Sequence, residues 1–155
     1  PQTRSKWRAV AEQIHGPTFE IFPERADPNK APSIYLTPLT DAAKRTIGFD
    51  ANADDLRRET MALARSTGKI AVTKPLTLVS DRDSPRRSVI LYAPVYQRPT
   101  PPGDEAERER TYVGAAFSPV RLDDFFRFAD EKMIGPSARI RVWQASDGEA
   151  PVALY

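Results

Sequence analysis

The stretch GFDANADDLRRETMALARSTGKIAVT, from Gly48 to Thr73, has the clearest local structural signals in this 155-residue chain. Asn52 is suited to cap a helix, and two aspartates follow it in the first turn, where carboxylates oppose the positive end of the helix dipole. Gly68 can adopt the left-handed conformation that commonly ends a helix. The stretch therefore predicts a helix over about Ala53 to Thr67, followed directly by a strand.

Within the predicted helix, apolar and small residues recur at helical spacing. The inward-facing stripe is predicted to be Leu56, Thr60, Leu63 and Thr67, flanked by Ala53 and Ala64. The arginines Arg57, Arg58 and Arg65 are predicted to point into water. Because the stretch carries no nucleophile, metal ligand or phosphate loop, it is expected to build the wall of a site rather than a reactive centre.

Runs of β-branched and aromatic residues predict strands around this helix. They cover Ser33–Leu39, Ile70–Thr73, Leu76–Val79, Ser88–Tyr96 and Thr111–Phe117, and a closing hairpin is predicted from Arg139–Trp143 and Val152–Tyr155. Both faces of Ser88–Tyr96 are apolar, which predicts a central strand covered on each side. Pro75 predicts an edge or a bend, because proline cannot donate to a sheet ladder.

The remaining segments complete the predicted fold. Residues Ser5 to Ile14 are predicted to be helical, and Pro119 is predicted to start a helix that ends at Gly135-Pro136. The segment from Gln97 to Arg110 is rich in proline and charge, so it is predicted to be an exposed loop that folding does not need. Hairpin-joined strands with helices to the side predict an α+β domain whose curved antiparallel sheet holds a small molecule on its concave face.

Composition excludes several functional classes. The chain is 40% hydrophobic and 28% charged, which is typical of a globular domain. Its 23 basic and 21 acidic residues give a net charge of only +2, and the basic residues are scattered, so no nucleic-acid partner is predicted. No stretch approaches the roughly 20 apolar residues of a membrane span. Since the chain starts at Pro1 without a signal peptide, we expect it to be excised from a longer protein.

Reactive side chains are scarce. The absence of cysteine excludes thiol nucleophiles and thiolate metal sites, and it suits an oxidising compartment. His15 is the single histidine, so a Ser-His-Asp triad and a zinc site are both disfavoured. The run Thr67-Gly68-Lys69 lacks the first glycine and the final hydroxyl of a phosphate-binding loop. The chain is therefore predicted to be non-catalytic, with no metal and no cofactor.

Four segments in a fixed order carry a family resemblance. They are GFDANADDLRRETMALARSTGKIAVT, LTLV, VILYAPVYQ and TYVGAAFSPVRLDDFF, with Gly48-Phe49-Asp50, Arg58, Thr67-Gly68, Pro94-Val95-Tyr96 and Gly114 before Phe117 as their markers. Together they resemble the CHASE domain family, which comprises extracytoplasmic sensory modules of histidine kinases and nucleotide cyclases, including the plant cytokinin receptors. The similarity covers about Ser33 to Phe126.

The resemblance implies an architecture and partners. A long N-terminal helix, of which Gln2 to Ile14 is the end, would precede two PAS-like subdomains: a ligand-binding one over residues 18–118 and a membrane-proximal one over residues 119–155. The resemblance also implies a homodimer through the upstream helix and flanking membrane spans. It implies a position on the periplasmic or extracellular face of a bacterial inner membrane, and a cytoplasmic histidine kinase or diguanylate cyclase.

The resemblance further implies a ligand site. In the plant receptors an aspartate hydrogen-bonds the adenine ring, and its match here is Asp41, while Thr73 matches a threonine of the same pocket. The apolar walls are predicted to be Tyr35, Leu63, Leu78, Tyr92 and Ala115. Because a carboxylate accepts hydrogen bonds, the ligand is expected to be an adenine-type or amine compound. As an alternative, Asp41 caps a short helical turn that begins at Thr40.

Three functions compete at this point. The first is a small-molecule sensor with its ligand between the sheet and the Ala53–Thr67 helix. The second is a ligand-independent dimerisation or protein-contact module whose pocket is filled by side chains. The third is a hydrolase, which the lack of histidine disfavours. A cavity of roughly 300 Å3 or more between sheet and helix separates the first two, because small-molecule sites are concave.

Overall fold

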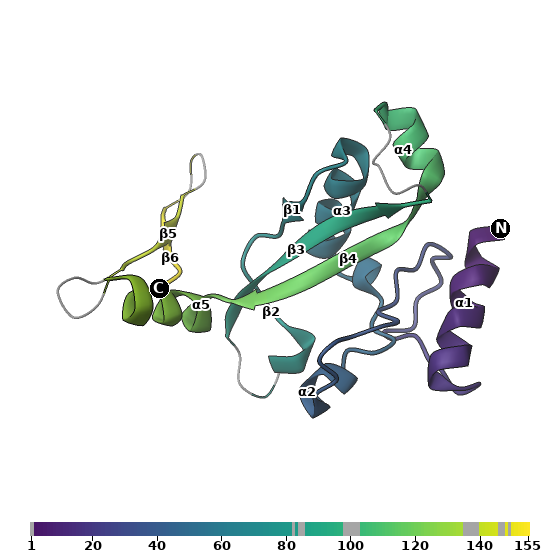
Figure 1. Cartoon of the computed structure of the whole chain (residues 1–155), viewed down its shortest axis with the longest axis horizontal. Helices are drawn as coiled ribbons and strands as arrows, with labels where there is room; N and C mark the ends of the chain where they lie inside the picture. Colours follow the sequence, from purple (N-terminus) through teal and green to yellow (C-terminus); the bar gives the residue numbers. More distant parts are fainter. Residues whose placement is uncertain are drawn as a thin grey trace.

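The computed structural model of this chain describes residues 2–81, 83, 86–97, 103–134, 140–145, 148 and 150–155 (Figure 1). A four-stranded antiparallel sheet, a separate two-stranded antiparallel sheet and several helices make up the described part. The predicted α+β class is therefore confirmed. The N-terminal helix and the C-terminal strands lie at opposite ends of the long axis (Figure 1). Among the described residues, every helix is too short or too polar to cross a membrane.

The first helix, α1 (Gln2–His15), includes the predicted helical segment Ser5–Ile14 and is followed by Gly16, which has a φ of +88°. The Nε2 atom of His15 donates a hydrogen bond to the carbonyl of Ile34 at 2.5 Å. Ala11 is fully buried. Thus the single histidine has a structural role at the end of α1.

The segment from residue 17 to residue 50 is irregular, and the predicted strand Ser33–Leu39 is wrong. Among the described residues, the β pairing of this segment consists of two isolated bridges, of Phe22 with Phe49 and of Pro32 with Asp50. Pro32 precedes the predicted strand and Pro38 lies inside it, and neither can donate to a ladder, which limits regular pairing there. A short helix, α2 (Asp41–Lys44), follows.

The Gly48–Asp50 segment ties this irregular region to the rest of the domain. Asp50 is completely buried. Its Oδ1 atom accepts hydrogen bonds from the backbone N–H groups of Ala31 at 2.8 Å and Asn52 at 3.1 Å, and its Oδ2 atom accepts one from Arg25 at 3.1 Å. Asp50 thereby caps the 3-10 turn η1 (Ala51–Ala53).

The predicted long helix exists, but it begins later than predicted. Helix α3 (Asp55–Thr67) is capped by Asp54, whose Oδ1 atom accepts a hydrogen bond from the N–H of Arg57 at 3.0 Å. Asn52 is used in η1 instead, because Asp50 caps that turn. Gly68 ends α3 in the left-handed conformation, with a φ of 72°, as predicted.

The buried face of α3 also differs from the predicted stripe. Its buried residues are Arg57, Thr60, Met61 and Ala64. Leu63 is 56% exposed, so the predicted inward direction of Leu63 and the predicted outward direction of Arg57 are both wrong. The large residues Ile90 and Tyr92 of the facing strand occupy the interface, so the face with Ala64 packs closest to the sheet.

The sheet is organised around β3 (Arg87–Tyr96), which is the central strand, as predicted. Strand β4 (Tyr112–Arg121) pairs with one edge of β3 along its whole length. Strands β1 (Ala71–Val72) and β2 (Leu76–Thr77) both pair with β3 as well, β2 with its first two residues and β1 with its middle. The break between β1 and β2 contains Pro75, which confirms the predicted interruption at this proline.

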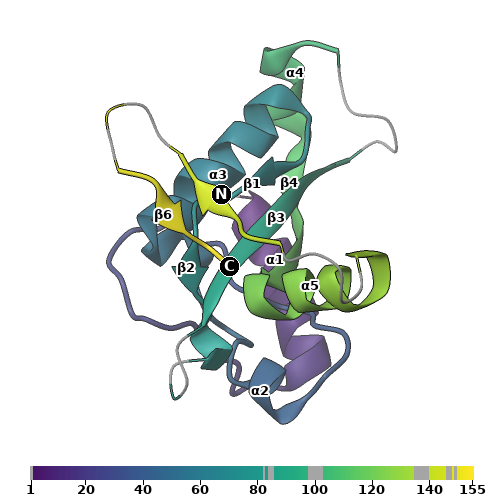
Figure 2. The same ribbon diagram turned by 90° about the vertical axis from the view of Figure 1, so that its left-hand side faces the viewer.

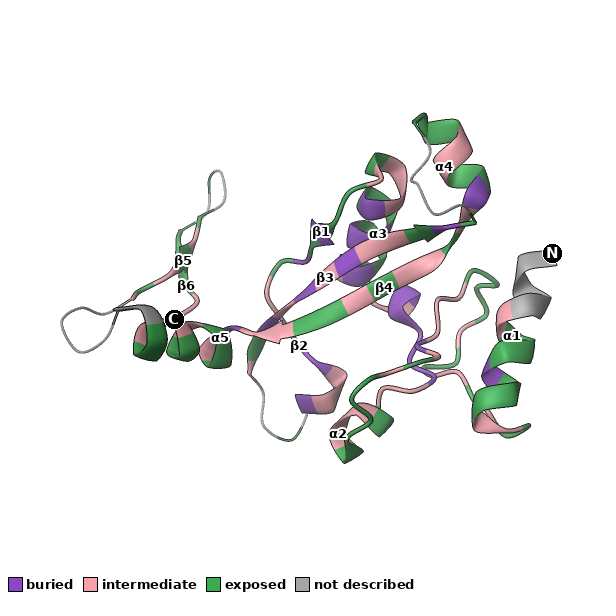
Figure 3. Ribbon diagram, viewed as in Figure 1, coloured by how far each residue is buried: buried purple, intermediate pink, exposed green. Residues whose placement is uncertain are grey.

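One face of the sheet is covered better than the other. Figure 2 shows α3 lying along one face, and there Ser88, Ile90, Tyr92 and Tyr96 are buried. On the opposite face the residues of β3 are half-buried, and Val95 is 42% exposed. The strand was predicted to be covered on both faces, and this prediction is wrong for the face that points away from α3. The burial is concentrated between α3 and β3 (Figure 3).

The predicted helix start at Pro119 is wrong. Pro119 lies inside β4, opposite Ile90. Because β4 pairs only with β3 among the described strands, a residue without an N–H is tolerated there. Helix α5 (Leu122–Ala129) follows β4 and continues into the π-helical turn η3 (Asp130–Ile134). The predicted end at Gly135-Pro136 lies outside the described residues.

The predicted loop from Gln97 to Arg110 contains a helix, α4 (Glu105–Thr111), capped by Asp104. Side chains around α4 contact the end of α3: Tyr96 donates to the carbonyl of Arg65 at 2.7 Å, and Arg108 donates to that of Ser66 at 2.5 Å. The interpretation as an exposed loop is therefore wrong for α4, because the alternating charges of this segment support a packed helix. Residues 98–102 lie outside the described part.

The remaining elements are short. The 3-10 turn η2 (Val79–Asp81) follows β2. Strands β5 (Trp143–Gln144) and β6 (Val152–Ala153) pair antiparallel, which confirms the predicted closing hairpin. Residues 146, 147 and 149 between the two strands lie outside the described residues.

Candidate functional site

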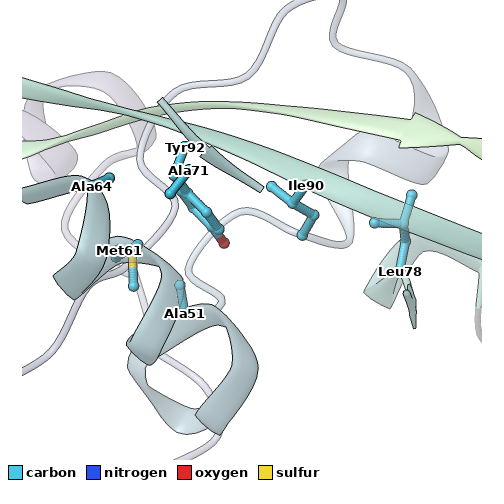
Figure 4. Packing of buried hydrophobic residues seen from close by; sticks show 7 residues of the cluster. All are labelled: Ala51, Met61, Ala64, Ala71, Leu78, Ile90 and Tyr92. Atoms are coloured by element: carbon cyan, nitrogen blue, oxygen red, sulfur yellow. The ribbon is translucent and has the colours of Figure 1, made fainter. Parts of the chain in front are cut away.

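The space between α3 and the sheet, where the ligand was predicted, is filled by side chains of the chain itself. Figure 4 shows this core, which consists of Ala51, Met61, Ala64, Ala71, Leu78, Ile90 and Tyr92. Each of these residues is at most 8% exposed. The interface between α3 and β3 is therefore a packed hydrophobic core.

Four of the predicted site residues lie in or against this core. Leu78 and Tyr92 belong to it, and Ala115 of β4 packs against it. Thr73 is 4% exposed, and its hydroxyl oxygen accepts a hydrogen bond from the N–H of Ile90 at 2.9 Å. That hydrogen bond extends the pairing of β1 with β3, so the Thr73 side chain stabilises the sheet and is not available to a ligand.

The other three predicted site residues lie on the surface. Tyr35 and Leu63 are 69% and 56% exposed. The side chain of Asp41 is 97% exposed, and its Oδ1 atom accepts a hydrogen bond from Lys44 at 2.8 Å. The cap of α2 is the Thr40 hydroxyl, which accepts from the N–H of Ala43 at 3.1 Å, while Asp41 occupies the first turn. The structure therefore does not bring the seven predicted residues together.

Arg57 is a buried polar residue that sequence reasoning missed. It is 5% exposed, and its guanidinium carbon lies 4.8 Å from the centre of the Phe49 ring, in a cation–π contact. Its Nε atom is 3.9 Å from the carboxylate of Asp54, and no hydrogen-bond partner for Nε exists among the described residues. The spacing of residues 57, 60, 61 and 64 is also helical, and this pattern was the signal that an inward arginine was possible.

Tyr92 shares this buried environment. Burial raises the pKa of the Tyr92 hydroxyl to about 12, and the neighbouring cation of Arg57 acts in the opposite direction. The hydroxyl is therefore protonated near neutral pH. Since Tyr92 is 2% exposed, this pair stabilises the core and does not face an open cavity.

An open cleft of about 410 Å3 lies beside this core. Residues from α3, from the β1–β2 region, from the start of β3 and from the C-terminal hairpin line it. They are Leu56, Lys74, Pro75, Leu76, Thr77, Arg87, Gln144, Ala150 and Val152. Its volume lies within the range of small-molecule sites, roughly 300–1,000 Å3.

The cleft was not predictable from any one segment, because its walls come from residues far apart in the chain. Leu56 was predicted to face inward, but Lys74, Arg87 and the hairpin residues carried no motif. The described residues contain no cluster of three or more metal-ligating side chains. The lining of the cleft offers binding chemistry through charge, hydrogen bonding and apolar contact.

A buried ion pair joins η2 to the end of β4. Both carboxylate oxygens of Asp81 accept hydrogen bonds from the guanidinium of Arg121, each at 2.7 Å. These hydrogen bonds hold the pKa of the Asp81 carboxyl below its ordinary value of 3.8, although burial acts in the opposite direction. This bidentate pair fixes the strand ends next to α5.

We expect Asp81 to give the domain an acid-sensitive contribution to stability. Its carboxyl has a lowered pKa in the folded state, so the contribution is complete above the ordinary pKa of 3.8 and is lost as the pH falls through the lower folded value. Denaturant unfolding of the wild type and of Asp81→Asn should differ most near neutral pH, and the two stabilities should converge in acid. A difference that does not shrink as the pH falls below 3.8 would contradict this role, because protonation of the carboxyl removes the charge that Arg121 binds.

Comparison with known proteins gives one family assignment. A family model described as the CHASE domain matches residues 1–155. A search of curated proteins found no match for the chain.

Proposed function

Since this chain belongs to the CHASE domain family, whose members are extracellular sensor modules of receptors and not catalytic domains, we propose that it binds a small molecule outside the membrane and transmits that event to a cytoplasmic histidine kinase or nucleotide cyclase. The receptor is proposed to lie in a bacterial inner membrane with this domain on the periplasmic face. The family match to the whole chain is the observation that carries this proposal.

We propose the cleft as the ligand site. The core under α3 is occupied by side chains, whereas the cleft is open and has apolar, hydroxyl, amide and cationic groups on its walls. Small-molecule sites usually combine an apolar lining with a few polar groups that fix the ligand orientation. The cleft has this combination.

The position of the cleft suggests how binding produces a signal. One wall belongs to α3 and β2, and the other includes Gln144 and Val152 of the C-terminal hairpin. In the proposed division into PAS-like subdomains, residues 18–118 contribute the first wall and residues 119–155 the second. A ligand that touches both walls favours the arrangement in which they are close, and such differential affinity is what a conformational signal requires.

The resemblance implies a second location, in which Asp41 anchors an adenine-type or amine ligand. A ligand there would compete with Lys44 for the Asp41 carboxylate. Because hydrogen bonds to a charged group contribute about 1.5–3 kcal/mol, Asp41→Ala should weaken binding at this location roughly 10- to 100-fold. A ligand in the cleft should be insensitive to the same substitution.

A thermal-shift screen with two strand variants tests the cleft. The panel contains purines, amines, amino acids and organic acids. A ligand at 100 times its Kd should stabilise the wild type by about 2.7 kcal/mol, or roughly 5–10 °C for a domain of this size. Thr77→Trp, which fills the cleft, should abolish the shift.

The matched control is Val113→Trp, at a 49% exposed position of β4 that is not part of the cleft lining. It should leave the ligand-induced shift unchanged. A shift that persists in Thr77→Trp but disappears in Asp41→Ala would move the site to Asp41. If no compound of the panel stabilises the wild type, the sensor proposal fails.

We further propose that the full receptor is a homodimer through the helix that continues α1 upstream. Two apolar residues one helical turn apart on α1, Val10 and Ile14, are 47% and 49% exposed and suit a helix–helix contact. The 14-residue α1 alone is too short for strong association, since isolated helices of about 12 to 15 residues are marginal. Sedimentation of this chain should show a monomer or a weak dimer, and a tight dimer would place the interface elsewhere.

A ligand-independent contact module is the second candidate function. The packed interior between α3 and the sheet favours it, and so do the exposed aromatic residues Phe125 and Phe128 of α5. In this case the domain would transmit contacts between receptor chains. The screen described above separates this function from ligand sensing, because a contact module shows no saturable ligand-induced stabilisation.

A further inference from the structure

We infer that the cleft between β2 and the C-terminal hairpin selects an organic anion with an apolar body. This inference rests on the proposed function, because it names the class of ligand for the same cleft. It differs from the adenine-type or amine ligand that Asp41 would bind.

Two cationic residues, Lys74 and Arg87, are part of the described lining of the cleft. No aspartate or glutamate is among the described lining residues. Within the described part of the chain, neither Lys74 nor Arg87 forms an ion pair. The cleft therefore presents two positive charges that a ligand can neutralise.

Many arginines of the described chain are ion-paired, although Lys30, Lys69, Lys132 and Arg141 share with Lys74 and Arg87 the lack of an ion pair among the described residues. Carboxylates within 4.0 Å neutralise Arg25, Arg65, Arg86 and Arg121. The chain has nearly equal numbers of basic and acidic residues, 23 and 21. Lys74 and Arg87 differ from these other unpaired cations because both line the same concave surface.

The strand register places these groups next to each other. Thr77 of β2 is directly opposite Arg87 of β3, so their side chains lie on the same face of the sheet. Lys74 precedes β2 in the break between β1 and β2, and it also lines the cleft. An anion between Lys74 and Arg87 would have the Thr77 hydroxyl and the Gln144 amide of the opposite wall as further hydrogen-bond donors.

The remaining lining explains why the anion needs an apolar body. Apolar side chains from the helix, from the edge strand and from the hairpin form most of the surface; they are Leu56, Pro75, Leu76, Ala150 and Val152. A small inorganic anion would neutralise the two cations but leave the apolar lining exposed to water. Burying apolar ligand surface against it adds affinity.

Four matched compounds test the charge preference: phenylpropionate, its amide, phenylpropylamine and phenylethyl phosphate. Binding to the 155-residue chain is measured by titration calorimetry, with inorganic phosphate as a fifth probe. Phenylpropionate should bind roughly 10- to 100-fold more tightly than its amide, because hydrogen bonds to charged groups contribute about 1.5–3 kcal/mol. Phenylpropylamine should bind no better than the amide.

The phosphate compounds distinguish the source of the anion. Comparable binding of phenylethyl phosphate and phenylpropionate would show that the cleft recognises anionic charge on an apolar body in general. Binding of phenylpropionate alone would narrow the class to carboxylates. Inorganic phosphate binding as tightly as both would overturn the role of the apolar walls.

The double variant Lys74→Met/Arg87→Met tests the residues, since methionine keeps an unbranched side chain without the charge. Affinity for phenylpropionate should fall roughly 10- to 100-fold and approach that for the amide. Lys69→Met is the matched control, because Lys69 is an exposed lysine outside the cleft lining. It removes one positive charge and should leave the affinity unchanged.

The outcomes separate this inference from the proposed function. If a neutral or cationic compound binds, is blocked by Thr77→Trp and is insensitive to Lys74→Met/Arg87→Met, the cleft is a ligand site but the anion preference is wrong. Equal affinity for phenylpropionate and its amide also overturns the preference. A fall in anion affinity with Lys74→Met/Arg87→Met, but not with Lys69→Met, supports it.

Discussion

Replacing Gly48 with alanine should destabilise the domain more than the same change at any other glycine whose surroundings the structure describes. Gly48 has a φ of +83°, and a Cβ atom on it would lie 2.1 Å from the carbonyl oxygen of Glu20. Hydrogen bonds hold the backbone on both sides, from the N–H of Gly48 to Ser33 and from the N–H of Phe22 to Gly48. Neither of the two backbone segments, the one with Glu20 or the one with Gly48, can move away without breaking a hydrogen bond.

The expected loss of unfolding free energy is about 2–5 kcal/mol. Roughly 1–2 kcal/mol comes from a left-handed conformation with a side chain, and about 1–3 kcal/mol from forcing an extra carbon into a packed place. Small domains have only about 5–15 kcal/mol in total, so the variant should be close to unfolding at elevated temperature. Denaturant unfolding followed by tryptophan fluorescence measures this change.

Gly16→Ala is the matched control for this prediction. Gly16 has a φ of +88°, but a Cβ atom there would meet no atom within 4 Å. Gly16→Ala should therefore cost only the conformational part, about 1–2 kcal/mol. If Gly48→Ala and Gly16→Ala lose the same stability, the close approach of Glu20 to Gly48 does not exist in solution.

The features that the sequence predicted correctly depend on local signals. Gly68 at the end of α3, the central strand β3 and the β5–β6 hairpin are each determined by residues within one short segment. The capping aspartates were harder to assign, because Asp50 and Asp54 each cap a different turn. A run of polar residues at a helix start allows several caps, and tertiary contacts select among them.

The errors involve contacts between distant segments. The buried side of α3 was assigned by hydrophobicity, which placed Leu63 inside and Arg57 outside. In the structure Phe49, which precedes α3, provides a ring for the Arg57 guanidinium, and this contact makes burial of an arginine possible. Nothing in the spacing of α3 alone distinguishes the two stripes.

The candidate cleft has the same kind of origin. Its lining combines Leu56, the residues from Lys74 to Thr77, Arg87 and the hairpin residues Gln144, Ala150 and Val152. Their proximity results from strand register and from the position of the hairpin. Neither the strand register nor the position of the hairpin can be derived from a single sequence. The residues transferred through family resemblance are divided between the core and the surface, because the resemblance fixes their positions in the chain and not their surroundings.

Asp50 is the second position where a single substitution should have a large effect. Its carboxylate is completely buried and receives three hydrogen bonds, from Ala31, Asn52 and Arg25. Asp50→Ala removes the acceptor of all three hydrogen bonds and leaves Arg25, whose side chain is 23% exposed, without its buried counter-ion. Removing one partner of a buried ion pair typically costs about 3–5 kcal/mol, and we expect a loss of this size.

Asp50→Asn separates the two sides of the carboxylate. Both backbone N–H groups bond to Oδ1, and Arg25 bonds to Oδ2. An asparagine can keep the first set through its carbonyl oxygen, but its amide nitrogen would face the Arg25 guanidinium, so two donors would meet. Loss of this charged hydrogen bond should cost about 1.5–3 kcal/mol, less than the loss in Asp50→Ala.

Asp27→Asn is the control, because Asp27 binds the same arginine. Its Oδ2 atom accepts a hydrogen bond from Nη2 of Arg25 at 2.9 Å, but its side chain is 45% exposed. Exposed ion pairs contribute about 0–1 kcal/mol, since water screens them. The order of stability should therefore be wild type, Asp27→Asn, Asp50→Asn and Asp50→Ala. If Asp27→Asn is as damaging as Asp50→Asn, Arg25 stabilises the irregular segment mainly through Asp27. The buried carboxylate of Asp50 would then not be its main anchor.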